Sequence, residues 1–134
     1  MGQCEVLVVS ADADLRGEVE AVVARTAAAR AVFADWRSGE RPEPASSDGI
    51  VVVDDEGQQG ALDLVHEVKA RRPGTAVIYL TARHEIDLER RVRQAGVSFY
   101  AAKASRGGDL ALALESMLRA RTRTSPPRAR RSAG

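Results

Sequence analysis

The stretch that decides the fold is Ile50-Val51-Val52-Val53-Asp54-Asp55. Its four consecutive β-branched residues lack the polar alternation of a half-exposed strand, so they are typical of a strand buried on both faces of a parallel sheet. Two acidic residues follow directly, where the strand ends. The sequence therefore predicts a central strand with carboxylates at one edge of a sheet.

Strand-like and helix-like segments alternate along the rest of the chain. Apolar runs mark strands at residues 5–10, 31–34, 50–53, 76–80 and 97–102. Apolar residues at helical spacing mark helices at residues 13–28, 61–72 and 85–95, and a last helix around Leu110, Leu114, Met117 and Leu118. Alternation of this kind predicts an α/β fold whose parallel sheet is covered by helices on both faces.

The segment between the second and third predicted strands breaks this alternation. It contains Pro42 and Pro44 together with a Ser-Ser-Asp-Gly turn cluster. Each proline removes a backbone donor and clashes with the preceding helical turn, so a regular helix is disfavoured here. We therefore expect residues 37–48 to form an irregular loop.

Composition is that of an ordinary single domain without a membrane span. The chain has 134 residues, enough for one domain with its own core, and no apolar run approaches the roughly 20 residues that cross a bilayer. Cys4 is the single cysteine, which excludes disulfide frameworks and cysteine zinc sites. The start of the chain lacks the basic segment of a signal peptide. These features predict a cytoplasmic location.

Charge is distributed unevenly along the chain. Six arginines and no acid lie between residues 119 and 134, so the net charge of +1 leaves residues 1–118 at −5. Apolar periodicity ends at Thr122, and we expect a domain over residues 1–122 followed by a disordered basic tail over residues 123–134. A solvated terminus is the simplest role for this tail, and contact with nucleic acid, a membrane or an acidic protein is the alternative.

Polar residues follow several of the predicted strands. In open parallel sheets the functional crevice lies at the carboxyl ends of the strands. The residues at those ends are Ser10-Ala11-Asp12, Asp54-Asp55, Thr81-Ala82 and Lys103. A functional site is therefore predicted among them.

With these end residues the chain resembles the receiver domain of response regulators, of the chemotaxis-regulator type. An aspartate, a threonine and a lysine close strands three, four and five in the receiver order and spacing, within residues 51–54, 77–82 and 95–103. The resemblance extends over residues 4 to about 120. It implies a doubly wound five-stranded sheet of flavodoxin-like order 2-1-3-4-5, here with a degenerate second helix. It also implies Asp54 as the phospho-acceptor position, with Thr81 and Lys103 in its pocket.

The chain departs from the receiver pattern where the family holds Mg²⁺. The family's acidic pair falls on Ser10 and Ala11. Mg²⁺ prefers hard oxygen ligands, usually one or two carboxylates together with water. Asp12 lies one position further along and is expected to face away as a helix cap, although rescue of the pocket by Asp12 or Asp55 stays open. We therefore expect weak or absent Mg²⁺ binding, no metal site and no cofactor.

Each remaining pocket residue also has a purely structural interpretation. Asp54 can close its strand by accepting backbone N–H groups, and Thr81 is a β-favouring residue at a strand end. Lys103 is expected to pair with Asp54 in either case. Without Mg²⁺, that pair would keep the pocket permanently neutralised.

Three functions remain open. The first is a stand-alone atypical receiver that acts as a protein-interaction module in two-component-type signalling, without obligatory phosphorylation and without enzymatic activity. The second is a phospho-accepting receiver in a phosphorelay, with Asp54 as acceptor. The third is a small flavodoxin-like nucleotide-binding enzyme, against which the lack of a phosphate-binding glycine loop and of a nucleophile elbow argues. The first is our prediction.

The expected partner is a protein, either a sensor kinase or a downstream effector. In receivers the surface of the fourth helix, fifth strand and fifth helix is the usual output face, which implies the same face here and allows a homodimer. Its interface-like residues are Arg90, Arg91, Arg93 and Tyr100, and we expect Tyr100 to lie outside the central core. A solvated helix face is the alternative for the arginines. No DNA-binding domain is expected after residue 122.

Overall fold

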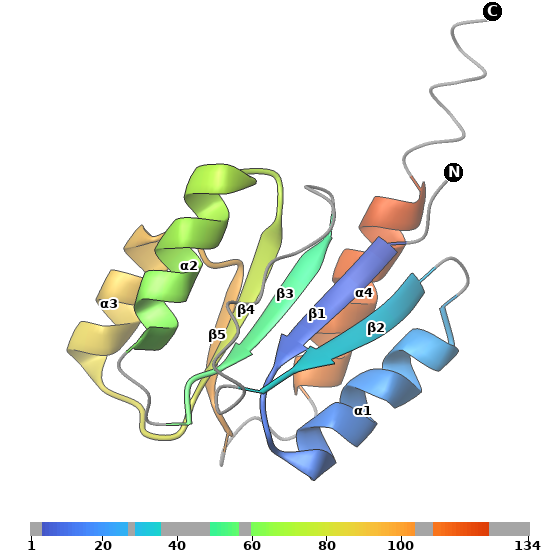
Figure 1. Cartoon of the computed structure of the whole chain (residues 1–134), viewed down its shortest axis with the longest axis horizontal. Helices are drawn as coiled ribbons and strands as arrows, with labels where there is room; N and C mark the ends of the chain where they lie inside the picture. Colours follow the sequence, from blue (N-terminus) through green and yellow to red (C-terminus); the bar gives the residue numbers. More distant parts are fainter. Residues whose placement is uncertain (1–3, 27–28, 36–48, 57–59, 104–108, 124–134) are drawn as a thin grey trace, which may run out of the picture.

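The computed structural model describes residues 4–26, 29–35, 49–56, 60–103 and 109–123. Its centre is a five-stranded parallel sheet in the order β2-β1-β3-β4-β5 (Figure 1). The strands are β1 (Cys4–Val9), β2 (Ala29–Ala34), β3 (Ile50–Asp54), β4 (Ala76–Thr81) and β5 (Phe99–Ala102). All neighbouring strands pair in parallel. The predicted fold class and strand order are confirmed.

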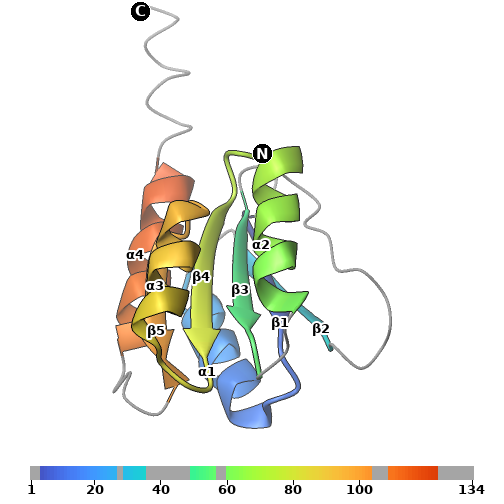
Figure 2. The same ribbon diagram turned by 90° about the vertical axis from the view of Figure 1, so that its left-hand side faces the viewer.

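Four helices cover the two faces of the sheet in the described part of the chain (Figures 1 and 2). Helices α1 (Ala13–Ala24) and α4 (Asp109–Arg123) pack on one face. Helices α2 (Gly60–Arg71) and α3 (Ile86–Gln94) pack on the other. The irregular loop expected over residues 37–48 lies outside the described residues. The tail was expected over residues 123–134, but Arg123 is the last residue of α4, and the rest of that tail also lies outside the described residues.

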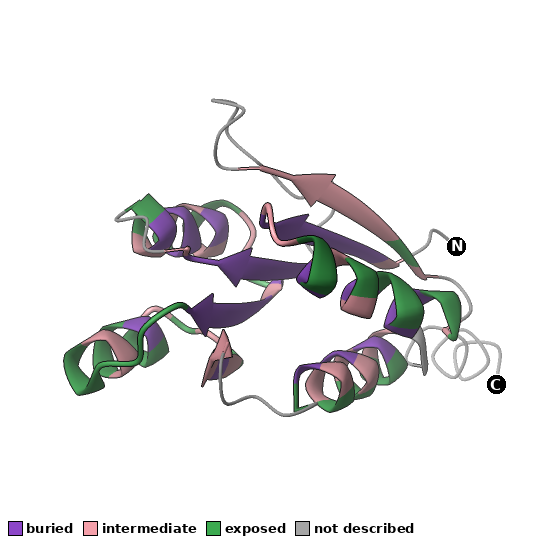
Figure 3. Ribbon diagram, turned by 90° about the horizontal axis from the view of Figure 1, so that it is seen from below, coloured by how far each residue is buried: buried purple, intermediate pink, exposed green. Residues whose placement is uncertain are grey.

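The central strands are buried on both faces, as the run at residues 50–53 predicted. β3 is fully buried along its length, and Figure 3 shows the buried strands between helices whose outer surfaces are exposed. Alternation of side chains divides each strand between two apolar clusters. Val52 therefore packs towards α1 and α4, whereas Val51 and Val53 pack towards α2 and α3.

Local hydrogen bonds fix where the helices end. α1 ends at Ala24, about four residues earlier than the helix predicted to residue 28, because the Arg25 amide and the Thr26 hydroxyl both donate to the Val22 carbonyl at 3.1 Å. Gly96 follows α3 with a φ of +96°, the left-handed conformation that favours glycine after a helix. None of the described helices is long and apolar enough to span a membrane.

Candidate functional site

The candidate site lies at the carboxyl ends of β1, β3 and β5, where Asp54, Ser10 and Lys103 converge. Asp54 is fully buried, and its Oδ2 accepts a hydrogen bond from the Ser10 hydroxyl at 2.6 Å. The same oxygen accepts one from the Lys103 ammonium at 2.9 Å. These residues continue the alternation of their strands on the face that α1 and α4 cover. The predicted pairing of Lys103 with Asp54 is confirmed.

Asp12 lies at the edge of this site, contrary to the expectation that it faces away. One of its oxygens caps α1 as expected, accepting the amides of Asp14 at 2.9 Å and Leu15 at 3.3 Å. The other oxygen is 2.7 Å from the Lys103 ammonium. A carboxylate has two oxygens with separate lone pairs, so capping a helix does not prevent Asp12 from binding a cation.

Glu56 is a site residue that the sequence analysis missed. Its Oε2 accepts the Ala11 amide at 2.7 Å and lies 3.3 Å from the Ser10 hydroxyl. Glu56 has a φ of +46°, a left-handed conformation that turns the chain directly after Asp55. The carboxylate therefore lies beside Ser10 and Ala11, at the positions where the receiver pattern has its acidic pair.

The ammonium of Lys103 is shared between two carboxylates. Partial burial opposes its charge, but the hydrogen bonds to Asp12 and Asp54 and their negative charges outweigh that cost and raise the pKa of Lys103 above its usual range. The hydrogen bond to Lys103 correspondingly lowers the pKa of Asp12, with smaller contributions from the capping amides. Lys103 thus stays charged, and Asp12 stays ionised, throughout the neutral range.

Asp55 and Thr81 make different contacts from Asp54, although they were predicted for the same pocket. Asp55 is 5% exposed and accepts the Tyr79 hydroxyl at 3.1 Å and the Ala82 amide at 3.0 Å. The buried hydroxyl of Thr81 donates to the Arg83 carbonyl at 2.9 Å and accepts the Arg83 amide at 3.2 Å. The Thr81 hydroxyl therefore closes a local turn at the end of β4, a contact that the sequence analysis did not anticipate.

Tyr100 belongs to the core, so the expectation that it lies outside the core is wrong. It is 8% exposed and packs in the cluster beneath α2 and α3. Its ring stacks on Tyr79 with centroids 6.0 Å apart, and its hydroxyl lies 3.1 Å from His84 Nδ1. Burial raises the pKa of Tyr100. Alternation along β5 turns the Tyr100 side chain towards the face of the sheet that α2 and α3 cover. Alternation alone does not show which side chains of a strand lie beneath a helix.

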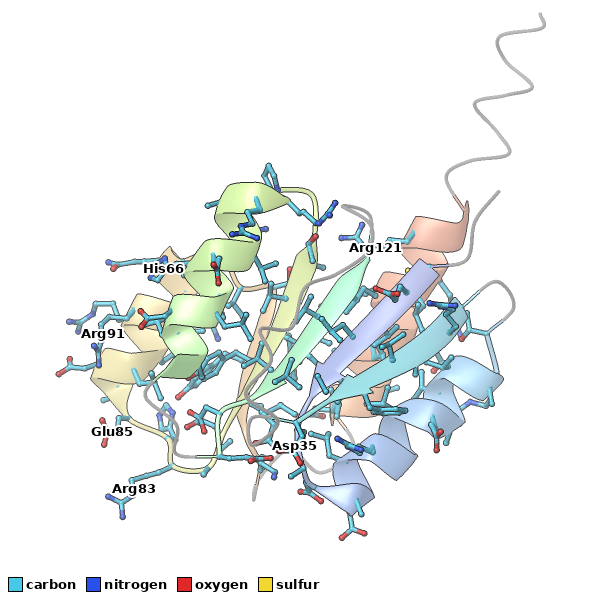
Figure 4. All side chains as sticks on the ribbon, in the orientation of Figure 1. Asp35, His66, Arg83, Glu85, Arg91 and Arg121 are labelled. Atoms are coloured by element: carbon cyan, nitrogen blue, oxygen red, sulfur yellow. The ribbon has the colours of Figure 1, made fainter. Side chains whose placement is uncertain are left out.

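The three arginines of the predicted partner face are exposed on α3. Arg90 pairs with Asp87 at 3.5 Å and Arg93 pairs with Glu89 at 2.9 Å within the helix. Arg91 projects away from the sheet, as does His66 on α2 (Figure 4). The α3 part of the predicted partner face is thus charged and accessible, whereas the buried Tyr100 does not belong to that surface.

The described residues contain no group of three or more His, Cys, Asp or Glu side chains arranged to hold a metal ion. The carboxylates of Asp12 and Asp54 converge on the Lys103 ammonium. Ser10 and Ala11, in turn, offer no carboxylate. The carboxylate beside these two residues comes from Glu56 instead, so the oxygen ligands at this edge differ from the acidic pair of the receiver pattern.

Comparison with solved structures identifies the fold class. A response regulator from Thermotoga maritima is 20% identical, with a TM-score of 0.65 over 87% of this chain and 98% of that chain. The BeF3-activated DrrB receiver domain is 19% identical, with a TM-score of 0.64 over 87% of this chain and 97% of that chain. A protein described as pilus assembly-related, from Burkholderia pseudomallei, is 15% identical, with a TM-score of 0.60 over 87% and 90% of the two chains.

The chain therefore has the fold of response-regulator receiver domains. No protein-family model matches it, and no curated protein sequence matches it.

Proposed function

We propose that this chain is an atypical receiver module that signals through protein contacts and does not depend on Mg²⁺-assisted phosphorylation. The observation that carries this proposal is the position of the Lys103 ammonium, 2.9 Å from Asp54 and 2.7 Å from Asp12. A lysine at this position belongs to the receiver pattern itself, but here Ser10 and Ala11 replace the acidic pair of that pattern. We therefore expect the Lys103 ammonium to neutralise Asp54 and Asp12 without a bound cation.

The neighbouring residues support the same proposal. Phosphoryl transfer requires a free acceptor oxygen and a cation that neutralises charge on the transferred group. The Asp54 Oδ2 already accepts hydrogen bonds from Ser10 and Lys103, and Asp54 is fully buried. The Glu56 carboxylate is also already bound, because its Oε2 accepts the Ala11 amide. This set of contacts favours a pocket that is stable without a ligand.

Titration with Mg²⁺ and beryllofluoride, followed by backbone amide chemical shifts, tests the proposal. We expect no saturable shift at Asp54, Thr81 or Lys103 up to concentrations well above about 1 mM, because Mg²⁺ loses its water reluctantly and finds too few free carboxylates. Mg²⁺-dependent binding of beryllofluoride to the unmodified protein would refute the proposal.

A matched variant shows whether the missing acidic pair is the cause. Restoring it by Ser10→Asp with Ala11→Asp adds two carboxylates beside Asp54, which repel one another until a cation binds. We expect this variant to gain measurable Mg²⁺ binding and to become more stable when Mg²⁺ is added. An unchanged Mg²⁺ response would show that the acidic pair is not what the pocket lacks.

Phosphorylation of Asp54 in a phosphorelay is the second candidate function. The observation in its favour is the contact of Asp54 with Lys103, since an aspartate and a lysine in this order and at these strand ends match the receiver pattern. The same titration separates the two functions: beryllofluoride binding supports phosphorylation, and its absence supports the Mg²⁺-independent module.

The exposed surface of α3 is the proposed contact for a kinase or effector. Arg90, Arg91 and Arg93 lie on this helix, and Arg91 projects away from the sheet (Figure 4). Arginine is enriched at the centres of protein interfaces. This assignment is tested by cross-linking a candidate kinase or effector to the intact protein through a cysteine introduced by Arg91→Cys. The comparison is a cysteine introduced by Arg71→Cys on α2. Preferential capture through position 91 is the expected result.

A further inference from the structure

Basic residues gather at the end of the molecule opposite the pocket. The strands point towards the pocket, whereas α2 and α4 run the other way and both end at the opposite end of the sheet (Figure 1). Arg121 on α4 lies at this end (Figure 4) and donates to the Gly74 carbonyl, in the turn between α2 and β4, at 3.0 Å. We call the surface formed here by five described residues the basic end: Lys69, Arg71, Arg72, Arg119 and Arg121.

Two arginines of the basic end are exposed and only weakly held. The Arg71 side chain is 57% exposed and lies 3.6 Å from Glu67, one turn back on α2. The Arg119 side chain is 65% exposed and lies 3.3 Å from Glu115, one turn back on α4. Exposed ion pairs of this kind contribute little, so either guanidinium group can turn to another anion at small cost.

The turn between α2 and β4 is fixed by a lysine and carries a further arginine. The Lys69 ammonium donates to the Pro73 carbonyl at 3.1 Å and to the Thr75 carbonyl at 2.9 Å. Arg72 begins this turn, and its Nε has no hydrogen-bond partner in the described part of the chain. The basic end is therefore a preformed surface whose donors are not all satisfied from within.

The positive charge of the basic end exceeds what its helix ends require. Its five basic residues and the two glutamates paired with them leave a charge of +3. The C-terminus of a helix carries about half a negative charge, so α2 and α4 together offset about one of these charges. About two positive charges remain beyond the compensation of the helix dipoles.

The acidic residues of the pocket do not cancel this charge. They lie at the carboxyl ends of the strands, and β1 and β4 each have six residues. At about 3.3 Å per residue, the two ends of the sheet are about 20 Å apart. This separation is more than twice the screening length of about 8 Å in physiological salt. An anion at the basic end therefore meets a positive field, although the net charge of the chain is only +1.

The basic end offers charge without a large apolar anchor. Among the described residues, the exposed large hydrophobic side chains are Ile86 and Leu112. Both lie in the first turn of their helices, at the pocket end of the molecule. Centres of protein interfaces contain buried aromatic or apolar anchors, and helices that lie on membranes insert apolar side chains. A partner that is recognised by its charge fits the basic end better than either.

The extent of the surface indicates the kind of anion. Helices α2 and α4 lie on opposite faces of the sheet, so the basic end extends across the sheet (Figures 1 and 2). A polymer of phosphates can span this width, whereas a single small anion cannot. The sequence after Arg119 contains further arginines but no acid and no aromatic residue. Arginine binds phosphate oxygens in a bidentate manner, and without aromatic side chains this segment cannot stack on bases.

We propose that the basic end binds the phosphate backbone of a nucleic acid, without regard to base sequence. The exposed guanidinium groups of Arg71 and Arg119 contact phosphate oxygens from the two faces of the sheet. Lys69 and Arg121 hold the turn and the two helix ends in place. The arginines that follow in the sequence add positive charge to the same contact. Neither the pocket nor the α3 surface takes part, so this binding is independent of the proposed function.

Fluorescence anisotropy of a short labelled DNA duplex, titrated with the full chain, tests the proposal. At about 50 mM salt we expect saturable binding that is the same for two unrelated sequences, because phosphates carry no sequence information. The logarithm of the binding constant should fall with the logarithm of the salt concentration, with a slope between about −3 and −5, as for three to five phosphate contacts.

Charge removal at two positions locates the contact. Arg71→Gln with Arg119→Gln should flatten the salt slope by about 2 and weaken binding at about 100 mM salt by at least about tenfold. The matched control is Arg90→Gln with Arg93→Gln on α3, which removes the same charge from two exposed arginines that are also paired within their helix. We expect the control to bind the duplex as the wild type does, and all variants to keep their melting temperature within a few degrees.

Amide chemical shifts provide a second readout that needs no variant. The duplex should perturb residues 69–75 and 119–121, and it should leave the pocket and α3 unchanged. The inference fails if no binding is found at low salt, or if the α3 control loses as much affinity as the double variant at the basic end. It also fails if only replacement of Arg128, Arg130 and Arg131 by glutamine weakens binding, or if vesicles of phosphatidylserine and phosphatidylcholine bind while the duplex does not. The first of these two results would assign binding to the tail alone, and the second would assign it to a membrane.

Discussion

Replacement of Lys103 by methionine tests the electrostatics of the pocket most directly. Methionine keeps an unbranched apolar side chain of similar length but removes the ammonium that lies between Asp54 and Asp12. Asp54, which is fully buried, then retains the Ser10 hydroxyl at 2.6 Å and the Glu56 amide at 3.3 Å as neutral donors. The variant therefore leaves a buried carboxylate without its cation.

The expected cost follows from the burial of the two partners. Removing one member of a buried ion pair costs about 3–5 kcal/mol. The Lys103 side chain is 22% exposed, so water can replace part of the lost interaction, and we expect the lower limit, about 3 kcal/mol. In an Asp54→Asn background Lys103 still has the partly exposed Asp12, a pair worth at most about 1 kcal/mol. The coupling energy between the two sites is therefore about 2 kcal/mol.

Urea unfolding of the four proteins at pH 7, followed by circular dichroism, gives the free energies of unfolding. For Lys103→Met alone we also expect a fall in Tm of roughly 10 °C for a domain of this size. A destabilisation below about 1 kcal/mol, or an equal cost with and without the Asp54 carboxylate, would refute the view that Lys103 acts as the internal cation.

Three further predictions concern single side chains. Asp12→Asn keeps the helix cap but loses the charge. Because the pKa of Asp12 is lowered from 3.8, the stabilisation that its charge provides is present above pH 3.8 and is lost as pH falls through the lowered value. The difference in unfolding free energy between wild type and Asp12→Asn should therefore be at most about 1 kcal/mol at pH 7 and should vanish in acid. Tyr100→Ala should destabilise the fold by about 3 kcal/mol, because it removes a buried aromatic ring; a Tm close to that of the wild type would show that the ring is not packed as described. Arg91→Glu should change the unfolding free energy by less than about 0.5 kcal/mol and should reduce capture of a kinase or effector by the α3 surface. Loss of the fold in this variant would contradict the surface position of Arg91.

The sequence by itself determined the sheet, most of the helices and the central pair of the site. The uninterrupted β-branched run before Asp54 requires burial on both faces, which a parallel sheet covered by helices provides. The carboxyl ends of parallel strands meet at one edge of the sheet, which predicted that Asp54 and Lys103 lie together. The Lys103 ammonium is 2.9 Å from the Asp54 Oδ2. These results depend on local periodicity and on the direction of parallel strands, which a single sequence contains.

The tertiary structure alone decided which atoms meet around that pair. Glu56 reaches the Ala11 amide because a left-handed residue turns the chain after β3, and neither composition nor spacing signals that turn. Asp12 was correctly expected to cap α1, but the destination of its second oxygen depended on where the long Lys103 side chain ends. Tyr100 is buried because α3 and Tyr79 cover its side of β5, a consequence of packing between elements far apart in sequence.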